Sequence, residues 1–442
     1  MKKTLLKNAK IVNENNTFDA DLLICNDTID TIASEISAKD HYQVIDLEGD
    51  LLLPGMIDDQ VHFREPGLEY KGCIASESRA AVAGGITSYM EMPNVSPATT
   101  TRLALNHKHD IAAQNSLANY SFYLGATPDN LEQIKACDPK LVCGVKVFMG
   151  ASTGDLLVEH PQALEAIFRE CPTLIATHCE KGDIISQNLA KLSSQNLTIQ
   201  HHPQIRDVEA CYASSSYAVD LAKKYNSDLH VLHITTAKEL ALFAPGPIET
   251  KKITAEACVH HLWFNQSDYD RLGNLIKCNP AIKSEHDRLA LLNAINEDRI
   301  DIIATDHAPH TWLEKQAAYS DAPAGLPLVE HALLSLLDQV KRGVISIEKM
   351  VEKVSHNPAK RYKIHQRGFI REGYFADLVA VSASASERVT HKNNNYLCAW
   401  SPFIDHQFSH SIRYTFVNGQ CVYDHGDILD HHKSAMPLMF NR

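Results

Sequence analysis

The middle of the chain alternates short apolar segments with helical patterns, and this alternation constrains the fold more than any other feature. The short segments have the length and the apolar content of buried strands. Eight of them are present, at residues 56–61, 86–92, 120–124, 142–148, 173–177, 229–232, 252–258 and 302–305. Stretches such as 214–225 and 289–295 have the periodicity of amphipathic helices. Eight strand–helix units in about 250 residues favour an α/β protein with a closed (β/α)₈ barrel of the TIM type over an open doubly wound sheet.

Both ends of the chain are rich in strand patterns instead. Short strand segments are expected at 9–12, 20–25, 28–33 and 43–47, and again at 377–381, 412–417 and 420–423. The last two flank Asn418-Gly419, a strong hairpin signal. Because the ends of a chain usually lie close together, we expect residues 1–53 and 367–442 to form one small β-sandwich domain beside a barrel of residues 54–366.

Composition indicates which partners to exclude and which cellular compartment to expect. The net charge of −12 disfavours nucleic acid or an anionic membrane as the main partner. The 11 cysteines include no Cys-x-x-Cys pair, as is usual in a reducing compartment. Polar residues interrupt the first segment too early for a signal peptide, and no apolar run reaches the roughly 18 residues of a membrane span. We therefore expect a cytoplasmic protein, and the 24 histidines prompt a search for metal ligands.

Five residues of metal-ligand type lie at or near the carboxyl ends of the predicted strands. They are His62, Lys146, His178, His233 and Asp306. In a barrel these ends meet at one mouth, where active sites are built. A single histidine in such a place is more often a satisfied core residue. Five converging groups instead indicate a metal-binding active site.

Lys146 is the most informative of the five, because a charged lysine inside an apolar strand is costly to bury. The side chain could reach solvent, find a buried partner, act as a neutral amine, or be carboxylated by carbon dioxide. Beside three histidines and an aspartate, a carboxylysine fits best, since its two oxygens can bridge two cations. Imidazole and carboxylate ligands suit zinc. Two such metals would acidify a bridging water, and Asp306 could take the proton.

Further polar residues follow other predicted strands. Arg64 could bind a carboxylate at the mouth, or form a surface ion pair with its neighbour Glu65. Asn94 and Asn279 are candidate ligand contacts, although either alone is more often a turn residue. His310 closes the string Asp306-His307-Ala308-Pro309-His310, with a surface histidine as the alternative. The pairs at 201–202 and 260–261 are interpreted as loop or core histidines.

Several strings together resemble the dihydroorotases of the amidohydrolase superfamily, over nearly the whole chain. They are Pro54-Gly55-Met56-Ile57-Asp58, His62-Phe63-Arg64-Glu65-Pro66-Gly67, Met92-Pro93-Asn94, Gly144-Val145-Lys146-Val147-Phe148-Met149, Asp306-His307-Ala308-Pro309-His310 and Gly373-Tyr374-Phe375-Ala376-Asp377-Leu378. The Phe-Arg-Glu-Pro-Gly string is the most specific, since hydantoinases lack that arginine and allantoinases usually differ at residues 63–64.

The resemblance implies a metal-dependent cyclic amide hydrolase with a barrel of the amidohydrolase type. Its reaction would be the reversible cyclisation of N-carbamoyl-L-aspartate to (S)-dihydroorotate by metal-activated hydroxide, in de novo pyrimidine (UMP) biosynthesis. The resemblance makes metal ligands of His62, Lys146, His178, His233 and Asp306, with Asp306 also the acid and base. Arg64, Asn94 and Asn279 would hold the carboxylate side of the substrate. His310 and the backbone near Gly325 would complete the pocket.

One residue departs from the pattern of that family. The family has His-x-His at the end of the first barrel strand, whereas this chain has Gln60-Val61-His62. An amide oxygen is a poor zinc ligand beside imidazole, so we expect one firmly held Zn²⁺ and a second that is weakened. The alternatives are a hydantoinase- or allantoinase-like cyclic amidase and a catalytically degenerate structural partner of aspartate transcarbamoylase. We also expect a homodimer, and a loop at 311–325 that is mobile without ligand and closes over the substrate.

Overall fold

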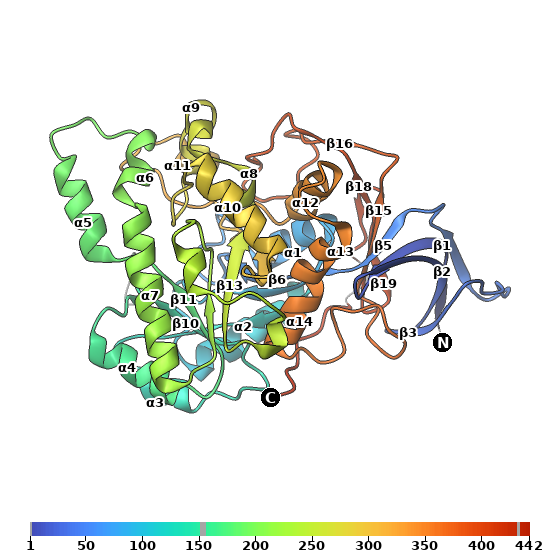
Figure 1. The fold of residues 1–442 in the computed structure, drawn as a ribbon. Coiled ribbons are helices and arrows are strands. Elements are labelled where there is room, and N and C mark those ends of the chain that lie inside the picture. Colours follow the sequence, from blue (N-terminus) through green and yellow to red (C-terminus); the bar gives the residue numbers. More distant parts are fainter. Residues whose placement is uncertain (1, 151–155, 431–433) are drawn as a thin grey trace.

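The computed structural model describes residues 2–150, 156–430 and 434–442. At its centre lie short parallel strands (Figure 1). They are β6 (Met56–Val61), β7 (Ile86–Glu91), β8 (Asn119–Phe122) with its continuation β9 (Leu124–Gly125), β10 (Val145–Phe148), β11 (Ile175–His178), β12 (Leu229–Val231), β13 (Ile253–Cys258) and β14 (Ile302–Ala304). Each pairs in parallel with the next strand along the chain. Every strand segment predicted for the barrel is present, within a few residues at its ends.

Two contacts close the strands into a barrel. One residue, Tyr123, separates β8 from β9 and so joins the two parallel sheets. At the other seam Val61 forms a parallel bridge with His307, and the His62 N–H donates to the His307 carbonyl at 2.7 Å. The closed barrel confirms the expected fold class over the open sheet.

Helices follow the strands and cover the outside of the barrel, where they exclude water from strands that are buried along their length. They are α1 (Ile74–Ala83), α2 (Arg102–Asn115), α3 (Leu131–Lys135), α4 (Pro161–Glu170), α5 (Gly182–Lys191), α6 (His202–Ile205), α7 (Val208–Tyr225), α8 (Val259–Trp263), α9 (Tyr269–Leu272), α10 (Glu285–Asn296), α11 (Trp312–Lys315), α12 (Ala332–Lys341), α13 (Ile347–Val351) and α14 (Asn357–Tyr362). Local signals set their ends. The Asp207 side chain, for example, accepts from the Ala210 N–H at the start of α7, and Asn226 ends that helix in the left-handed conformation.

The two ends of the chain meet in one sheet of nine strands, in the order β20-β19-β18-β15-β5-β1-β2-β3 with β4 paired to β1. The blue and red strands lie side by side in Figure 1. They are β1 (Lys3–Asn13), β2 (Asn16–Cys25), β3 (Thr28–Ala33), β4 (Gln43–Asp46), β5 (Leu51–Pro54), β15 (Leu378–Ser382), β18 (Ser411–Val417), β19 (Gln420–Asp424) and β20 (Asp427–Ile428), and β16 (Glu387–Arg388) pairs separately with β17 (Gln407–Phe408). The hairpin expected at Asn418-Gly419 joins β18 to β19. The boundaries 1–53, 54–366 and 367–442 stay a prediction.

The last residues of the chain return to the barrel. Leu438 donates its N–H to the Tyr120 carbonyl at 2.8 Å, and the Arg442 side chain donates to the Cys143 carbonyl at 3.0 Å. These contacts lie at the amino ends of β8 and β10, so the opposite end of the barrel stays free for a site. Within the described residues, no helix is long and apolar enough to cross a membrane.

Candidate active site

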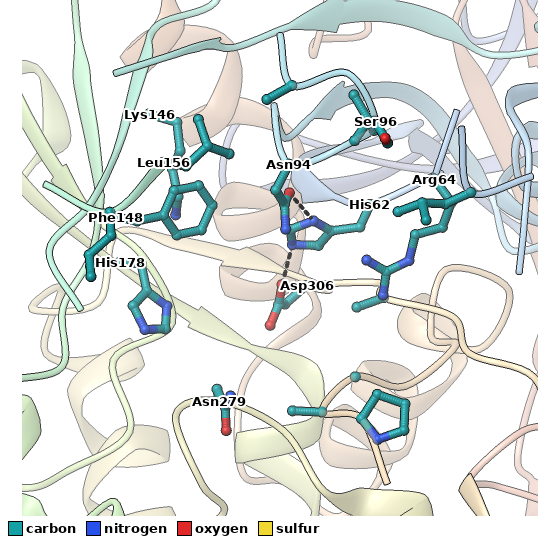
Figure 2. A pocket seen from close by; sticks show the side chains of 18 of the residues that line it. His62, Arg64, Asn94, Ser96, Lys146, Phe148, Leu156, His178, Asn279 and Asp306 are labelled. Carbon is teal, nitrogen blue, oxygen red and sulfur yellow. Dashed lines mark hydrogen bonds and ion pairs between the residues drawn. The ribbon is translucent and has the colours of Figure 1, made fainter. Parts of the chain in front are cut away.

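A cavity of about 1240 Å³ opens at the carboxyl ends of the barrel strands. Its lining includes every site residue predicted from the sequence, together with Gln60; the predicted residues are His62, Arg64, Asn94, Lys146, His178, His233, Asn279, Asp306, His310 and Gly325. Figure 2 shows how the labelled members face one another across the cavity. The structure therefore brings the whole set together at one mouth.

His178 and His233 face each other on one side of this mouth. The His178 Nε2–H donates to the Glu180 carboxylate at 3.1 Å, which leaves the lone pair on Nδ1. That Nδ1 lies 3.0 Å from His233 Nε2, close to the roughly 3.3 Å between two nitrogens that share a tetrahedral cation. Burial lowers the pKa of both imidazoles and so favours the neutral, metal-binding form. The pair therefore fits one divalent cation.

Glu180 holds the His178 ring and was missed by the sequence reasoning. It is fully buried and forms an ion pair with Arg206. Burial alone would raise its pKa, but the charge of Arg206 and the hydrogen bond from His178 lower it, so Glu180 stays a carboxylate. The only sequence signal for Glu180 was its position two residues after the candidate ligand His178. Its partner Arg206 is distant in sequence. Such carboxylate–histidine pairs fix the tautomer of a metal ligand.

His62 and Asp306 occupy the other side of the mouth. His62 Nδ1–H donates to Asn94 Oδ1 at 2.8 Å, and its Nε2 lies 3.1 Å from Asp306 Oδ1 (Figure 2). Both neighbours of this ring are acceptors, whereas a neutral imidazole carries one N–H. Burial lowers the pKa of His62 and disfavours a second proton. A cation between Nε2 and the Asp306 carboxylate would satisfy both atoms, so this side also fits a metal.

Gln60 takes a place beside Asp306. Its side-chain amide donates to Asp306 Oδ1 at 3.0 Å, and its amide oxygen faces the Cys258 thiol, with Sγ at 3.8 Å. Gln60 therefore offers a hydrogen to the carboxylate, and its oxygen accepts from the Cys258 thiol. Burial raises the pKa of Asp306, but the contact with His62 and the charges of His62, His260 and Lys146 together lower it, which keeps Asp306 ionised.

Lys146 lies between these two sides on β10, with 1% of its surface exposed. Its Nζ is 4.7 Å from the centroid of the Phe148 ring. Burial lowers the pKa of this ammonium to about 8, although the charges of Asp306 and Glu256 act against that shift. The uncharged amine, which is the form that reacts with carbon dioxide, is therefore more populated near neutral pH than in an ordinary lysine, although the ammonium still predominates.

Arg64 and His310 form the third wall of the cavity. Arg64 is 7% exposed; its Nε donates to the Pro309 carbonyl at 3.1 Å, and one terminal nitrogen lies 3.0 Å from His310 Nε2. The Lys71 ammonium donates to the other ring nitrogen of His310 at 3.1 Å. Burial lowers the pKa of Arg64 to about 10, so the guanidinium stays charged at neutral pH. The alternatives of a surface ion pair with Glu65 and a surface histidine do not describe these buried side chains.

Asn279 and Gly325 border the same wall. The His202 Nε2–H donates to Asn279 Oδ1 at 3.2 Å and to the Cys278 carbonyl at 2.8 Å. His202, which the sequence placed among loop or core residues, thus orients Asn279. Gly325 has φ +139°, and a Cβ there would lie 2.4 Å from the Ala308 carbonyl oxygen. Only glycine fits this close approach.

The loop at 311–325 lies at the rim of the cavity and is anchored by buried lysines. The Lys315 ammonium donates to the carbonyls of Lys277, Pro323 and Gly325 at 2.8–3.2 Å. Lys277 in turn donates to the carbonyls of Tyr319 and Ala322. These contacts hold the loop over the site in this structure. Its mobility without ligand stays a prediction.

A second buried network lies inside the barrel and was also missed. Asp59, His230 and Glu256 are all fully buried, and His230 Nε2 lies 3.1 Å from Asp59 Oδ2. Burial works against the charge of His230, but the neighbouring carboxylates of Asp59 and Glu256 raise its pKa to about 8. Glu256 also accepts from the His233 N–H at 2.9 Å. This network therefore supports the backbone of a residue at the mouth.

Comparisons with known proteins agree with this architecture. The model of the amidohydrolase family matches residues 51–422. The dihydroorotase of Halobacterium salinarum is 33% identical over 91% of this chain and 93% of its own length, and that of Methanosarcina acetivorans is 30% identical over 95% and 91%. Among solved structures, the L-hydantoinase (dihydropyrimidinase) of Arthrobacter aurescens has a TM-score of 0.93 at 25% identity, covering 99% of this chain and 100% of its own.

Proposed function

We propose that this chain, which belongs to the amidohydrolase family, is a dihydroorotase that interconverts N-carbamoyl-L-aspartate and (S)-dihydroorotate in pyrimidine biosynthesis. The chain is a hydrolase of cyclic amides, as its family and its dihydroorotase relatives indicate. The observation that carries the proposal is the buried, charged Arg64 across the cavity from His178 (Figure 2). A dihydroorotate carries a carboxylate that such a guanidinium can bind.

In the proposed reaction, different residues of the cavity bind the substrate carboxylate and the reacting amide. Arg64, Asn94 and Asn279 would hold the carboxylate side of the substrate, and His310 and the backbone near Gly325 would complete the pocket. The wall formed by the ligand-type residues would then face the ring amide that opens or closes. Because Asn94 also accepts from His62, it links substrate binding to the orientation of a metal ligand.

The donor set fits Zn²⁺ at the mouth. His178 and His233 would hold one cation, and His62 with Asp306 a second, with Lys146 carboxylated to bridge them. When bound, a divalent cation supplies Lewis acidity toward water and toward the amide carbonyl. Asp306 would accept a proton from the attacking water and deliver it to the ring nitrogen as the C–N bond breaks. In the cyclisation direction the same carboxylate would move the proton the other way.

Removing the Arg64 charge tests the substrate assignment. Arg64→Met should reduce transition-state binding by about 3 kcal/mol, which is a loss on the order of 100-fold in kcat/KM for dihydroorotate. Spectrophotometric assays with dihydroorotate, hydantoin and allantoin side by side measure this loss. The exposed Arg271, replaced in the same way, serves as the control and should leave the rate unchanged.

The same assays separate the alternatives. If the unmodified enzyme turns over hydantoin or allantoin faster than dihydroorotate, the cyclic amidase alternative is correct. If it turns over none of the three while its metal is in place, a degenerate partner of aspartate transcarbamoylase is the better description. An Arg64→Met variant with an unchanged kcat/KM would remove Arg64 from the substrate site.

Gln60 should make the two metal positions unequal. After dialysis against a chelator we expect nearer one zinc than two per chain at the mouth, because the His62 side has lost an imidazole ligand. Gln60→His should raise the zinc retained at the mouth, measured by elemental analysis as the part of the zinc that is lost when Lys146 is also replaced. Suppose that the unmodified protein keeps two zinc ions per chain after chelator treatment, and that both are lost when Lys146 is replaced. That result would contradict the expectation that Gln60 weakens the second metal position.

The proposal also covers the oligomeric state of the protein and its cellular compartment. We propose a homodimer in the cytoplasm, with residues 1–53 and 367–442 as the small domain and 54–366 as the catalytic barrel. The 11 cysteines are all free thiols, which supports a reducing compartment. Light scattering on the purified protein, alone and with aspartate transcarbamoylase, would measure both the dimer and any association.

A further inference from the structure

A second group of metal-ligand side chains lies behind Gln60, outside the set described above. Cys258 ends β13, and His260 and His261 lie in the first turn of α8, the helix that follows it (Figure 1). We call these three residues the α8 cluster. Each offers one donor atom, and the three atoms lie within 4.8 Å of one another. The exposed fractions are 0% for Cys258, 0% for His260 and 3% for His261.

The hydrogen bonding of these histidines is incomplete. Among the residues that the structure describes, neither ring nitrogen of His260 has a hydrogen-bond partner. His261 Nε2–H donates to the Pro280 carbonyl at 3.1 Å, so the lone pair lies on Nδ1, which has no partner in the same part of the chain. Buried polar groups are rarely left in this state. A histidine that binds a metal usually donates the N–H of its other ring nitrogen to a carbonyl or a carboxylate, as His261 does here.

We propose that the α8 cluster is a transition-metal site for a divalent cation of the zinc class. One thiolate and two imidazoles are the donors that such cations prefer. Donor atoms around a tetrahedral zinc are separated by about 3.3–3.8 Å, so modest side-chain rotations would bring the cluster from its present spacing into place. The amide oxygen of Gln60, 3.8 Å from Cys258 Sγ, is placed to complete the coordination.

Gln60 would then connect the two metal positions. Its nitrogen donates to Asp306 Oδ1 at 3.0 Å at the mouth, and its oxygen faces the α8 cluster. The imidazole that the His-x-His pattern would place at residue 60 could not present an N–H to Asp306 and a carbonyl oxygen to Cys258. The departure at residue 60 therefore places an amide oxygen beside the thiol of the α8 cluster.

Packing alone is the competing explanation. The rings of His260 and His261 have centroids 4.0 Å apart at an angle of 43°, as two core side chains could. Packing accounts for this contact but leaves three ring nitrogens without a hydrogen-bond partner among the described residues. A cation accounts for the ring positions and for two of these nitrogens.

Cobalt(II) alone is the probe that separates this site from the mouth. The full-length protein is stripped with a chelator and titrated with cobalt(II), and the thiolate-to-cobalt charge-transfer absorption is recorded. The donors at the mouth are nitrogen and oxygen atoms and give no such band. We expect the band in the wild-type protein and in His178→Ala. We expect its loss in Cys258→Ser and its retention in the control Cys143→Ser, which replaces an equally buried thiol.

The titration also contains the results that would overturn the proposal. A wild-type protein that binds cobalt without a thiolate band has no metal on Cys258, and a band that persists in Cys258→Ser comes from another thiol. If Cys258→Ser does not fold, the variants His260→Gln and His261→Gln replace it in the test, because both keep the thiol that gives the absorption band. Each should shift the titration to about tenfold higher cobalt or more, and unchanged affinity in both would contradict the site. Dihydroorotate turnover plays no part in this readout, so failure of the proposed function would leave the test intact.

Discussion

Asp306→Asn should reduce kcat/KM for dihydroorotate by about 10²–10⁴-fold, the usual contribution of a general acid and base. The amide keeps an oxygen near His62 but cannot accept the proton of the attacking water. Because Gln60 and His62 both contact Oδ1, the amide oxygen would stay at that position and the NH₂ group would replace Oδ2. Steady-state rates in both directions of the reaction measure the loss.

Two comparisons make the Asp306 result interpretable. Asp287→Asn replaces a buried carboxylate at the start of α10, outside the cavity, and should stay within a few-fold of the wild-type rate. Metal content is measured on both variants, because part of any loss in Asp306→Asn could come from the cation. A metal-loaded Asp306→Asn enzyme within a few-fold of wild type would show that another group carries the proton.

Lys146→Met should abolish most of the activity and empty the mouth of metal. The side chain fills a similar volume but can neither react with carbon dioxide nor offer an oxygen to a cation. Metal stabilisation of a developing charge is worth several kcal/mol, and each 1.36 kcal/mol is tenfold in rate. The expected loss is therefore on the order of 10³-fold or more, measured as kcat/KM together with the zinc retained per chain.

Bicarbonate distinguishes carboxylation from a simple loss of charge. Stripped wild-type protein should take up zinc at the mouth faster and more completely when bicarbonate is supplied with the metal. The Lys146→Met variant should show no response to bicarbonate. Equal zinc uptake with and without bicarbonate in the wild type, in carbon dioxide-free buffer, would contradict a carboxylysine and favour a free amine at this position.

The barrel and the members of its mouth could be predicted from the sequence, because both depend on local signals. Strand length, apolar content and turn residues repeat along the chain, and parallel strands bring their carboxyl ends to one edge. Residues such as His62, His178 and Asp306 could therefore be placed together without knowing any contact between them. The Asn418-Gly419 hairpin is local in the same sense, since its two strands are adjacent in sequence.

The partners of these residues were decided only by the tertiary structure. Gln60 reaches Asp306 across 246 positions of the chain and Cys258 across 198, and no periodicity reports which end of an amide faces which neighbour. Asn94 binds the ring of His62, and His202 orients Asn279, although each asparagine alone resembles a turn residue. Cys258, His260 and His261 are neighbours in the sequence, but only the structure shows that their donor atoms converge within 4.8 Å. Hydrogen-bond pairing inside a barrel depends on how strands that are distant in sequence pack together. Because an unpaired buried polar atom costs free energy, each such side chain takes the orientation in which that packing offers it a partner.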